Sequence, residues 1–263
     1  MRYSKKSLGQ NFLKDLNIIK KIVSLSKITN NDIVEIGPGR GALTDQILKK
    51  KPKSLTLIEK DNLLSYELKL KYKNNKIVKI FNDDILEFDL EKKIKKNTVI
   101  FGNLPYNISS QILVKIVRFK KWPPNYSSII FMFQKEMADR IVGKFGTKKY
   151  GRLSILTNYK LDILNSFDVS PNCFIPAPKV NSTILFFKPK KQLFNIIKNI
   201  NNLEKVTNIL FSNRRKMINK NIKKIFKETK FLNLIKNLDH KSRPSDLNPE
   251  MYYNIAKIFE EIS

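Results

Sequence analysis

The sequence has very few of the residues that bind metals or form disulfides. Of its 263 residues, one is cysteine (Cys173) and one is histidine (His240). A single cysteine cannot form a disulfide within the chain, which favours a reducing compartment. No group of cysteines and histidines has metal-ligand spacing, so we expect a protein without a resident metal ion.

Long apolar runs are also absent. No apolar segment approaches the roughly twenty residues that a membrane-spanning helix needs. The first six residues, MRYSKK, lack the apolar core of a signal peptide. We therefore expect a soluble, cytoplasmic protein. No feature of the sequence indicates an oligomer, so we expect a monomer.

Acidic residues are scarce relative to basic ones. The chain has 23 Asp and Glu against 51 Lys and Arg, a net charge of +28. Such a surplus attracts phosphates and predicts a polyanionic partner whose binding weakens with salt. Lysine supplies 43 of the 51 basic residues, a bias that an AT-rich genome also produces. Part of the charge therefore does not indicate binding. The alternative to a polyanionic partner is a lysine-rich surface that is simply solvated.

Strand-like and helix-like segments alternate up to about residue 188. The predicted strands are 32–36, 54–58, 76–81, 99–101, 128–134, 162–169 and 181–188, and two of the helices are 135–142 and 152–158. This alternation predicts an α/β sandwich with a mostly parallel sheet.

The pattern becomes helical and rich in Lys and Asn after Pro189. Residues 190–263 carry 16 basic and 7 acidic side chains. We predict two domains: residues 1–189, which bind a cofactor, and residues 190–263, a small basic helical domain. Asn248 is the predicted N-cap of the last helix, with Pro249 at its first position.

A glycine-rich turn follows the predicted strand 32–36. Gly37-Pro38-Gly39-Arg40-Gly41 precedes an apolar-periodic helix that begins at Ala42. Glycines at a strand-to-helix turn let the backbone approach a ligand closely, with helix N–H groups facing it. Gly37, Gly39 and Ala42 fit the pattern G-x-G-x-x-G/A, which does not distinguish a site for NAD from one for S-adenosylmethionine.

Acidic residues stand at the ends of the next two strands. Glu59 follows strand 54–58, about twenty residues after the glycines, where an acid can bind ribose hydroxyls. Asp84 is placed to accept a hydrogen bond from an adenine amino group, while Ile85 lines the ring. Each acid alone is equally well explained as a solvated loop carboxylate, but their order along the chain is much harder to attribute to chance.

The tetrapeptide Asn103-Leu104-Pro105-Tyr106 follows the apolar strand 99–101. Such a tetrapeptide is typical of sites that methylate a planar exocyclic amine, whose delocalised lone pair makes it a poor nucleophile. Asn103 offers a side-chain carbonyl, Leu104 a backbone carbonyl and Tyr106 a stacking face. Pro105 fixes φ and removes a competing donor. A purely structural turn is the alternative for the tetrapeptide taken alone.

Seven segments together resemble one family over essentially the whole chain, the ribosomal RNA adenine N6,N6-dimethyltransferases that act on the small subunit. The matching segments are Lys6–Leu13 (KSLGQNFL), Val34–Gly39 (VEIGPG), Phe101–Ser109 (FGNLPYNIS), Gln134–Glu136 (QKE), Tyr150–Ser154 (YGRLS), Phe174–Ser182 (FIPAPKVNS) and Phe211–Lys216 (FSNRRK). The joint occurrence of these motifs is far more specific than any one of them.

The resemblance implies a Rossmann-like class I methyltransferase fold with seven strands, one of them antiparallel near the end. It implies S-adenosylmethionine as the cofactor, with Gln10, Asn11 and Leu13 closing over its methionine end. It places Asn103 between the cofactor and a target adenosine, with Tyr106 on one face of the base and Phe174 covering the other. The implied substrate is a pair of adjacent adenosines in a hairpin loop near the 3′ end of 16S rRNA in the small (30S) subunit, modified in late subunit biogenesis.

A basic run is predicted to hold the RNA backbone. Arg214, Arg215 and Lys216, followed by Lys220 and Lys223, are predicted to cover much of one helix's exposed surface. Phosphate contacts of this kind position a substrate without reading its bases. An ordinary solvated helix face is the alternative.

Other functions fit part of the pattern. A large-subunit rRNA adenine methyltransferase of the antibiotic-resistance type shares the first domain, but the segments PAPKVNS and FSNRRK look like the small-subunit family. A DNA adenine methyltransferase would need a target-recognition domain, and a protein-glutamine methyltransferase would leave the basic helical end unexplained. A non-enzymatic nucleic-acid-binding factor would not need Asn103 and Glu59, which are both present. An NAD oxidoreductase would need hydride-transfer residues that do not follow the glycines.

Overall fold

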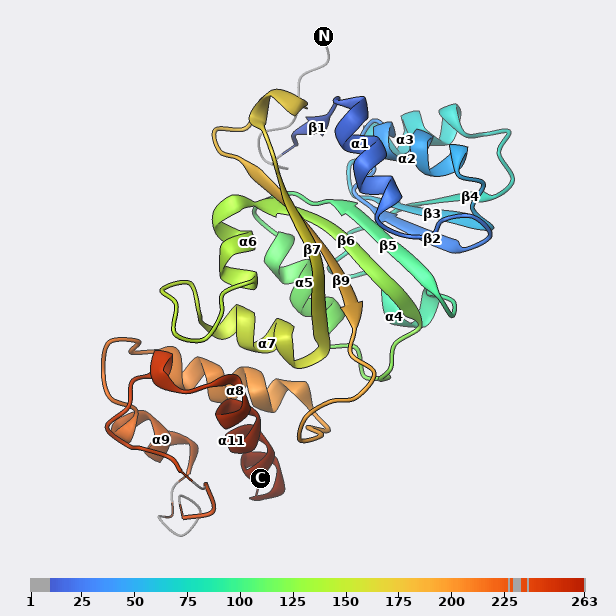
Figure 1. Ribbon diagram of the computed structural model, residues 1–263. Coiled ribbons are helices and arrows are strands. Elements are labelled where there is room, and N and C mark those ends of the chain that lie inside the picture. The colour runs from blue at the N-terminus through green and yellow to red at the C-terminus, as the bar shows by residue number, and fades with distance from the viewer. Residues whose placement is uncertain (1–9, 227, 229–232, 236, 263) are drawn as a thin grey trace. The chain divides into compact units, whose positions relative to one another are not determined.

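The computed structural model describes residues 10–226, 228, 233–235 and 237–262 (Figure 1). Residues 6–9 of the first motif segment lie outside this part. The chain divides into two compact units. The first contains the described residues up to 138 together with 162–189, and the second contains 139–161 and the described residues from 190 onward. One boundary between the units falls at 189/190. Residues 139–161 lie in the second unit, a division the sequence did not indicate.

A seven-stranded sheet forms the centre of the first unit. Its strand order is β4-β3-β2-β5-β6-β9-β7. The strands are β2 (Asp32–Ile36), β3 (Ser54–Glu59), β4 (Val78–Asn82), β5 (Thr98–Asn103), β6 (Tyr126–Gln134), β7 (Leu161–Val169) and β9 (Ser182–Pro189). Strands β2 to β6 pair in parallel, and β9 pairs antiparallel to β6. The predicted mostly parallel sheet with one antiparallel strand is confirmed.

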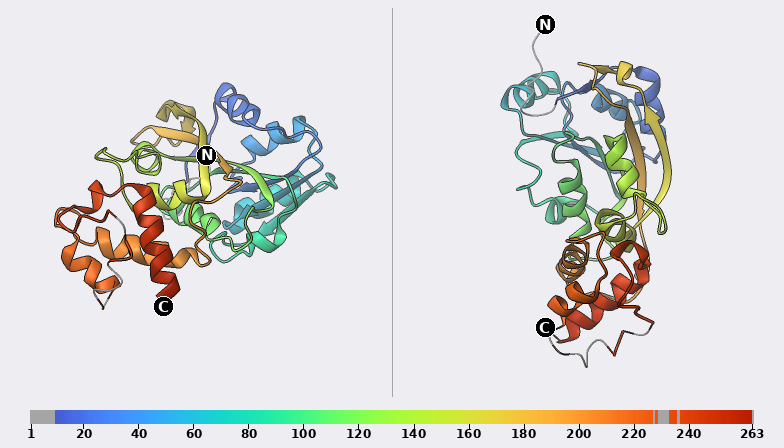
Figure 2. Two further views of the ribbon diagram at one scale, coloured as in Figure 1. Left: turned by 60° about the horizontal axis from the view of Figure 1, so that its bottom comes forward. Right: turned by 90° about the vertical axis from the view of Figure 1, so that its left-hand side faces the viewer.

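Helices flank this sheet, and the two views in Figure 2 show them on either side of it. Those of the first unit are α1 (Leu16–Ser24), α2 (Ala42–Lys49), α3 (Asn62–Lys71), α4 (Leu90–Lys93) and α5 (Ser109–Val117), and α6 (Lys135–Ile141) spans the boundary between the units. Asp15 and Asp61 cap α1 and α3 because their side chains accept two backbone N–H groups each. Helices α1, α2 and α3 bury their apolar residues against one face of the sheet, where they form a core with alternate residues of the strands.

A second, two-stranded sheet was not predicted. Strand β1 (Phe12–Leu13) pairs antiparallel with β8 (Phe174–Ile175), so that Leu13 lies opposite Phe174. The Lys14 N–H donates to the Cys173 carbonyl at 2.8 Å. Two-residue strands carry no periodicity, and therefore the sequence gives no signal for them. Their pairing fastens the start of the described chain to the segment before β9.

The second unit is built from helices α7 (Arg152–Lys160), α8 (Ile200–Phe211), α9 (Asn219–Ile225) and α11 (Pro249–Ile262). Tyrosines join its parts: the Tyr150 hydroxyl donates to the Leu247 carbonyl at 2.9 Å, and the Tyr159 and Tyr253 rings lie 4.9 Å apart. These contacts explain why residues 139–161 belong to this unit. Asn248 Oδ1 accepts the Met251 N–H at 2.8 Å, which confirms the predicted N-cap. No helix of the described residues is long and apolar enough to cross a membrane.

Candidate active site

A cavity lies at the carboxyl ends of β2, β3, β4 and β5. Its lining comes from the segments that follow these four strands, from residues 10–13 and from the first turns of α2, α3 and α5. Strand β2 has β3 on one side and β5 on the other, so the chain reverses its winding direction at this point. In open parallel sheets such a switch point leaves a crevice in which ligands bind.

The glycine turn forms one wall of the cavity. Gly37 and Gly39 have φ values of +66° and +57°, in the left-handed region that favours glycine. A Cβ on Gly39 would lie 3.0 Å from two ring atoms of Phe12, which packs directly over the turn. The Arg40 guanidinium lies 4.6 Å from the centre of the same ring. The turn and β1 therefore enclose one end of the cavity together.

Glu59 lies at the end of β3 and is 7% exposed. Its carboxylate accepts the Gly39 N–H at 3.1 Å and the Asp61 N–H at 2.9 Å, one on each oxygen. Burial raises the pKa of this carboxyl, and the backbone N–H donors around it partly oppose the rise. A carboxylate has about four lone-pair sites, so Glu59 keeps acceptor capacity for a donor in the cavity.

Asp84 lies beyond β4 and is held from two sides. Lys60 Nζ donates to one carboxylate oxygen at 2.6 Å, and the Leu86 N–H donates to the other at 2.9 Å. Partial burial acts to raise the pKa of Asp84, but these donors outweigh it and leave the pKa below its ordinary value. Ile85, next in the chain, is buried and gives the cavity an apolar wall.

Glu35 is a cavity-lining carboxyl within β2 itself. It is 2% exposed and accepts the Thr44 hydroxyl at 2.6 Å. Burial raises the pKa of Glu35 to about 8. At neutral pH this carboxyl is therefore mainly protonated, so the cavity floor carries a neutral polar group.

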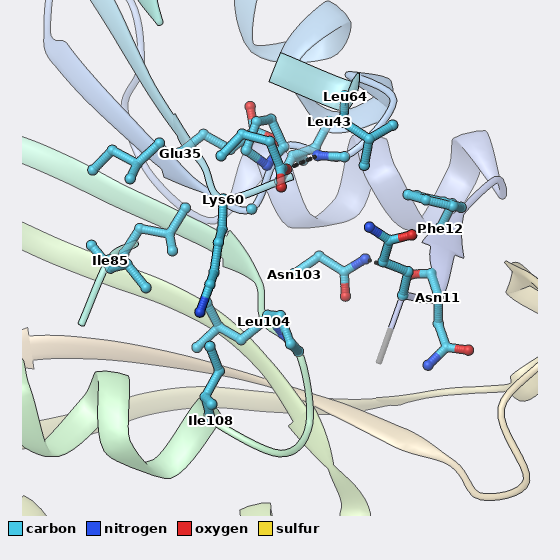
Figure 3. Close-up of a pocket in the computed structure, with 18 of the residues that line it drawn as sticks. Asn11, Phe12, Glu35, Leu43, Lys60, Leu64, Ile85, Asn103, Leu104 and Ile108 are labelled. Carbon is cyan, nitrogen blue, oxygen red and sulfur yellow. Dashed lines mark hydrogen bonds between the residues drawn. The ribbon is translucent and has the colours of Figure 1, made fainter. Parts of the chain in front are cut away.

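Asn103, at the end of β5, has a defined side-chain orientation (Figure 3). Its Nδ2 donates to the Asn11 carbonyl at 3.1 Å. Because this bond uses the amide nitrogen, the Oδ1 acceptor points away from Asn11, as Figure 3 shows. The result is an acceptor fixed at the edge of the cavity.

The rest of the tetrapeptide lines the cavity beside Asn103. Leu104 is 2% exposed, and a Cβ on Gly102, two residues earlier, would lie 2.6 Å from its Cδ2, so glycine is needed for this packing. The Tyr106 hydroxyl shares a 2.6 Å hydrogen bond with Ser182 Oγ on β9. Burial raises the pKa of Tyr106 and keeps the phenol neutral.

Most of the site residues named from the sequence come together at this cavity. Those that line it are Gln10, Asn11, Leu13, Gly37, Gly39, Glu59, Asp84, Ile85, Asn103, Leu104, Pro105 and Tyr106. Gln10 Nε2 also donates to Asp61 at 3.2 Å, which ties the start of the described chain to α3. Phe174 is the exception, because it is 2% exposed, packs within the core and is not part of the lining.

Sequence reasoning missed Phe12, Glu35 and Lys60, which also line the cavity. Glu35 had a usable signal, because an acid inside an otherwise apolar strand must be neutral or paired. Lys60 stands next to Glu59, but its bond to Asp84 joins residues 24 apart and leaves no local trace.

The basic run lies on a turn between two helices, not on one helix as predicted. Arg214, Arg215 and Lys216 occupy the turn between α8 and α9, and Lys220 and Lys223 lie on α9. The chain turns here because the Ile218 N–H bonds to the Ser242 carbonyl and Ile218 is fully buried. All five cations are exposed. One Arg214 nitrogen also donates to the carbonyls of Lys148 and Tyr150, at 2.7 and 2.9 Å.

Comparison with known proteins decides the family. The model of one family, described as ribosomal RNA adenine dimethylase, matches residues 1–261. The chain belongs to the ribosomal RNA adenine dimethylase family. A family relative from Pelagibacter ubique, named ribosomal RNA small subunit methyltransferase A, is 44% identical over 98% of both chains. A relative of the same name from Francisella tularensis subsp. novicida is 41% identical, over 93% of this chain and 90% of its own.

Solved structures show the same fold. A dimethyladenosine transferase from Plasmodium falciparum superposes with a TM-score of 0.77 at 25% identity, over 93% of this chain and 95% of its own. The 23S rRNA methyltransferase ErmE superposes with a TM-score of 0.69 at 20% identity, over 95% of this chain and 99% of its own. The predicted class I methyltransferase fold is thereby confirmed.

Proposed function

We propose that this protein uses S-adenosylmethionine to dimethylate the N6 amines of two adjacent adenosines near the 3′ end of 16S rRNA in the small ribosomal subunit. Membership of the rRNA adenine dimethylase family and the names of the relatives support this reaction. The observation that carries it is the fixed orientation of Asn103, whose Nδ2 bonds to Asn11 while Oδ1 faces the site.

The residues of the cavity fit the proposed cofactor. S-adenosylmethionine supplies an activated methyl group on a positively charged sulfur. The Glu59 carboxylate, at the end of β3 in the cavity lining, is the acceptor for the ribose hydroxyls. Asp84 has acceptor capacity for the adenine amine, and Ile85 offers an apolar surface to the ring. The bare backbone of Gly37 and Gly39 leaves room for the remainder.

The target adenosine must leave its base stack before N6 can enter such a site. Asn103 Oδ1 and the Leu104 carbonyl accept the two N6 hydrogens, which holds the amine and turns its lone pair toward the cofactor side. The Tyr106 ring supports the base from one face, and its bond to Ser182 fixes the ring. Positioning and fixed dipoles supply the catalysis. A dedicated base is not needed, because the alkylated nitrogen loses its extra proton readily to water.

We assign rRNA binding to the exposed cations of the second unit, Arg215, Lys216, Lys220 and Lys223. Arg214 contributes charge to the same surface and also bonds to the carbonyls of residues 148 and 150. Phe174 has a positioning role in this proposal. It is buried and pairs with Leu13 of β1, and this packing holds β1 against the site. We retain a cytoplasmic monomer without a resident metal as part of the proposal.

Methyl transfer to isolated ribosomal subunits tests the function. Small subunits prepared without the modification are incubated with labelled S-adenosylmethionine, and the nucleosides are then separated. We expect N6,N6-dimethyladenosine at two adjacent positions. Asn103→Ala should lower the rate by at least about 100-fold, as loss of a preorganised polar contact to the reacting group does in other enzymes.

Three outcomes would contradict the proposal. Label on large-subunit RNA alone would favour the resistance-type methyltransferase. Tight subunit binding without transfer would favour a non-enzymatic factor. Transfer by Asn103→Ala at the wild-type rate would remove Asn103 from the mechanism.

A further inference from the structure

We propose that the first unit has a second RNA-binding surface, which lies at the amino ends of its parallel strands and grips rRNA phosphates away from the target base. This inference rests on the proposed function, because it takes rRNA as the partner. We call this surface the amino edge. It consists of the five connections that precede β2, β3, β4, β5 and β6, namely residues 25–31, 50–53, 72–77, 94–97 and 118–125.

The amino edge carries charge of one sign only. Its five connections contain eleven basic residues and no Asp or Glu. All eleven are exposed: Lys27, Lys50, Lys51, Lys53, Lys73, Lys76, Lys95, Lys96, Arg118, Lys120 and Lys121. The connections at the opposite ends of β2 to β5 (37–41, 60–61, 83–89 and 104–108) contain two basic and five acidic residues.

This contrast argues against lysine bias as the cause. A compositional drift toward lysine would add cations to both ends of the sheet alike, and it would not remove the acids from one end. The chain as a whole has about two basic residues for each acidic one. The charge is therefore sorted by position, and a polyanion is the partner that such a surface fits.

The connections lie along one edge of the sheet (Figure 1). Because β2 to β6 pair in parallel, their amino ends share this edge. Backbone bonds join Asn30 to Lys51 at 3.1 Å and Lys53 to Asn31 at 2.9 Å. Asn125 Nδ2 donates to the Ile94 carbonyl at 3.3 Å, which joins two further connections. These hydrogen bonds hold the connections in place, so the amino edge loses little conformational entropy when it binds.

The nearest carboxylates are already engaged. Asp32 accepts from Lys95 Nζ at 3.3 Å and from the Ser54 hydroxyl. Glu91 accepts the Lys121 N–H at 2.8 Å. These bonds hold the connections in place and neutralise only a small part of the charge of the amino edge. A row of exposed cations on one edge suits a phosphate backbone, which needs no base readout.

The chain supplies its own reporter for this surface. Trp122, the only tryptophan in the sequence, lies in the last of the five connections and is half-buried. Its ring lies edge-on to Tyr126 at 6.4 Å. In the isolated protein, excitation selective for tryptophan therefore reports on the amino edge alone. We expect Trp122 emission to change when protein-free 16S rRNA, which adds no tryptophan, is titrated into the wild-type protein.

Charge removal tests the surface. The variant Lys53→Gln, Lys96→Gln, Lys120→Gln removes one cation from each of three connections. The control Lys20→Gln, Lys191→Gln, Lys198→Gln removes the same net charge from exposed positions outside the amino edge. Affinity for small subunits is measured against salt. We expect the edge variant to bind about tenfold or more weakly and its log–log salt slope to fall by about two to three, with much smaller changes in the control.

An edge variant with the affinity and salt slope of the control would overturn the inference, as would a Trp122 signal that does not respond to protein-free 16S rRNA. A Trp122 response to phosphatidylglycerol vesicles but not to this RNA would overturn it in favour of a membrane. Wild-type methyl transfer, assayed on the same samples, keeps the two proposals separate. If the wild type transfers methyl groups and the edge variant binds subunits as the control does, only the amino-edge proposal is rejected. If the wild type binds subunits through the amino edge without transferring methyl groups, only the proposed reaction is rejected.

Discussion

The two ends of the same parallel sheet differ in charge and in how their side chains are held. At the carboxyl ends, acids such as Glu59 and Asp84 are wholly or partly buried, and each accepts at least two hydrogen bonds. At the amino ends, the eleven cations of the amino edge are exposed, and all of them lie on connections of four to eight residues. The sheet is shared, so the connections alone account for the difference.

This contrast matches the two ligands of the proposed reaction. A small cationic cofactor is recognised by a few fixed acceptors in a partly enclosed cavity, where each hydrogen bond contributes strongly. A long polyanion is recognised by many exposed cations, each of which contributes little and loses strength in salt. We infer that catalytic changes will map to the carboxyl ends and affinity changes to the amino ends.

The largest expected effect at the carboxyl ends is on stability, through Glu35. Its pKa rises from an ordinary value of 4.5 to about 8 in the folded protein. The stability it confers is therefore fully present below about pH 4.5 and is lost as the pH rises to about 8. Each pKa unit corresponds to about 1.4 kcal/mol, so the total is on the order of several kcal/mol.

Glu35→Gln should remove this dependence. Urea unfolding between pH 5.5 and 8.5 should show the free energy of unfolding of the wild type falling with pH relative to that of the variant. Parallel curves for the two proteins would contradict the buried, mainly protonated carboxyl.

A somewhat smaller effect is expected on cofactor affinity when Glu59 changes. Glu59→Gln should weaken S-adenosylmethionine binding at least about tenfold, because hydrogen bonds to a charged acceptor contribute about 1.5–3 kcal/mol. Glu87→Gln is the matched control, since Glu87 is an exposed acid at the same end of the sheet. Titration calorimetry measures both. Equal affinities for the two variants would mean that Glu59 does not contact the cofactor.

The smallest effect separates two neighbouring arginines of the second unit. Arg214→Ala should lower the free energy of unfolding by about 1–2 kcal/mol, because it removes bonds to the carbonyls of Lys148 and Tyr150. Arg215→Ala should leave stability unchanged and weaken subunit binding. Urea unfolding and a binding titration on both variants distinguish structural from RNA-binding cations. Loss of stability in Arg215→Ala alone would reverse the assignment.

The sequence predicts the main sheet well because each strand is a short apolar run bounded by turn residues. Strand β2 has the predicted ends, and β9 is shifted by one residue at each end. The cavity residues could be named because glycine turns and strand-end acids have fixed places in parallel α/β folds. These features are local in sequence, and local features are what periodicity and spacing report.

Long-range pairings could not be predicted in the same way. The β1–β8 sheet joins residues about 160 apart through two pairs only, so neither partner shows a strand pattern. The turn after α8 depends on the burial of Ile218 and on its bond to Ser242. The packing of residues 139–161 with the rest of the second unit depends on single tyrosine hydroxyls such as that of Tyr150. Each of these features is decided by a distant partner.

We infer that catalysis depends on the carboxyl ends of the strands and RNA affinity on the amino ends. The most direct test is single-turnover methyl transfer to small subunits at increasing enzyme concentration. It yields a saturating rate and a half-saturating concentration for Asn103→Ala and for the Lys53, Lys96, Lys120 triple variant. We predict that Asn103→Ala lowers the saturating rate at least about 100-fold with little change in half-saturation. The triple variant should raise half-saturation about tenfold or more at an unchanged rate. Two variants that alter the same parameter would contradict the account.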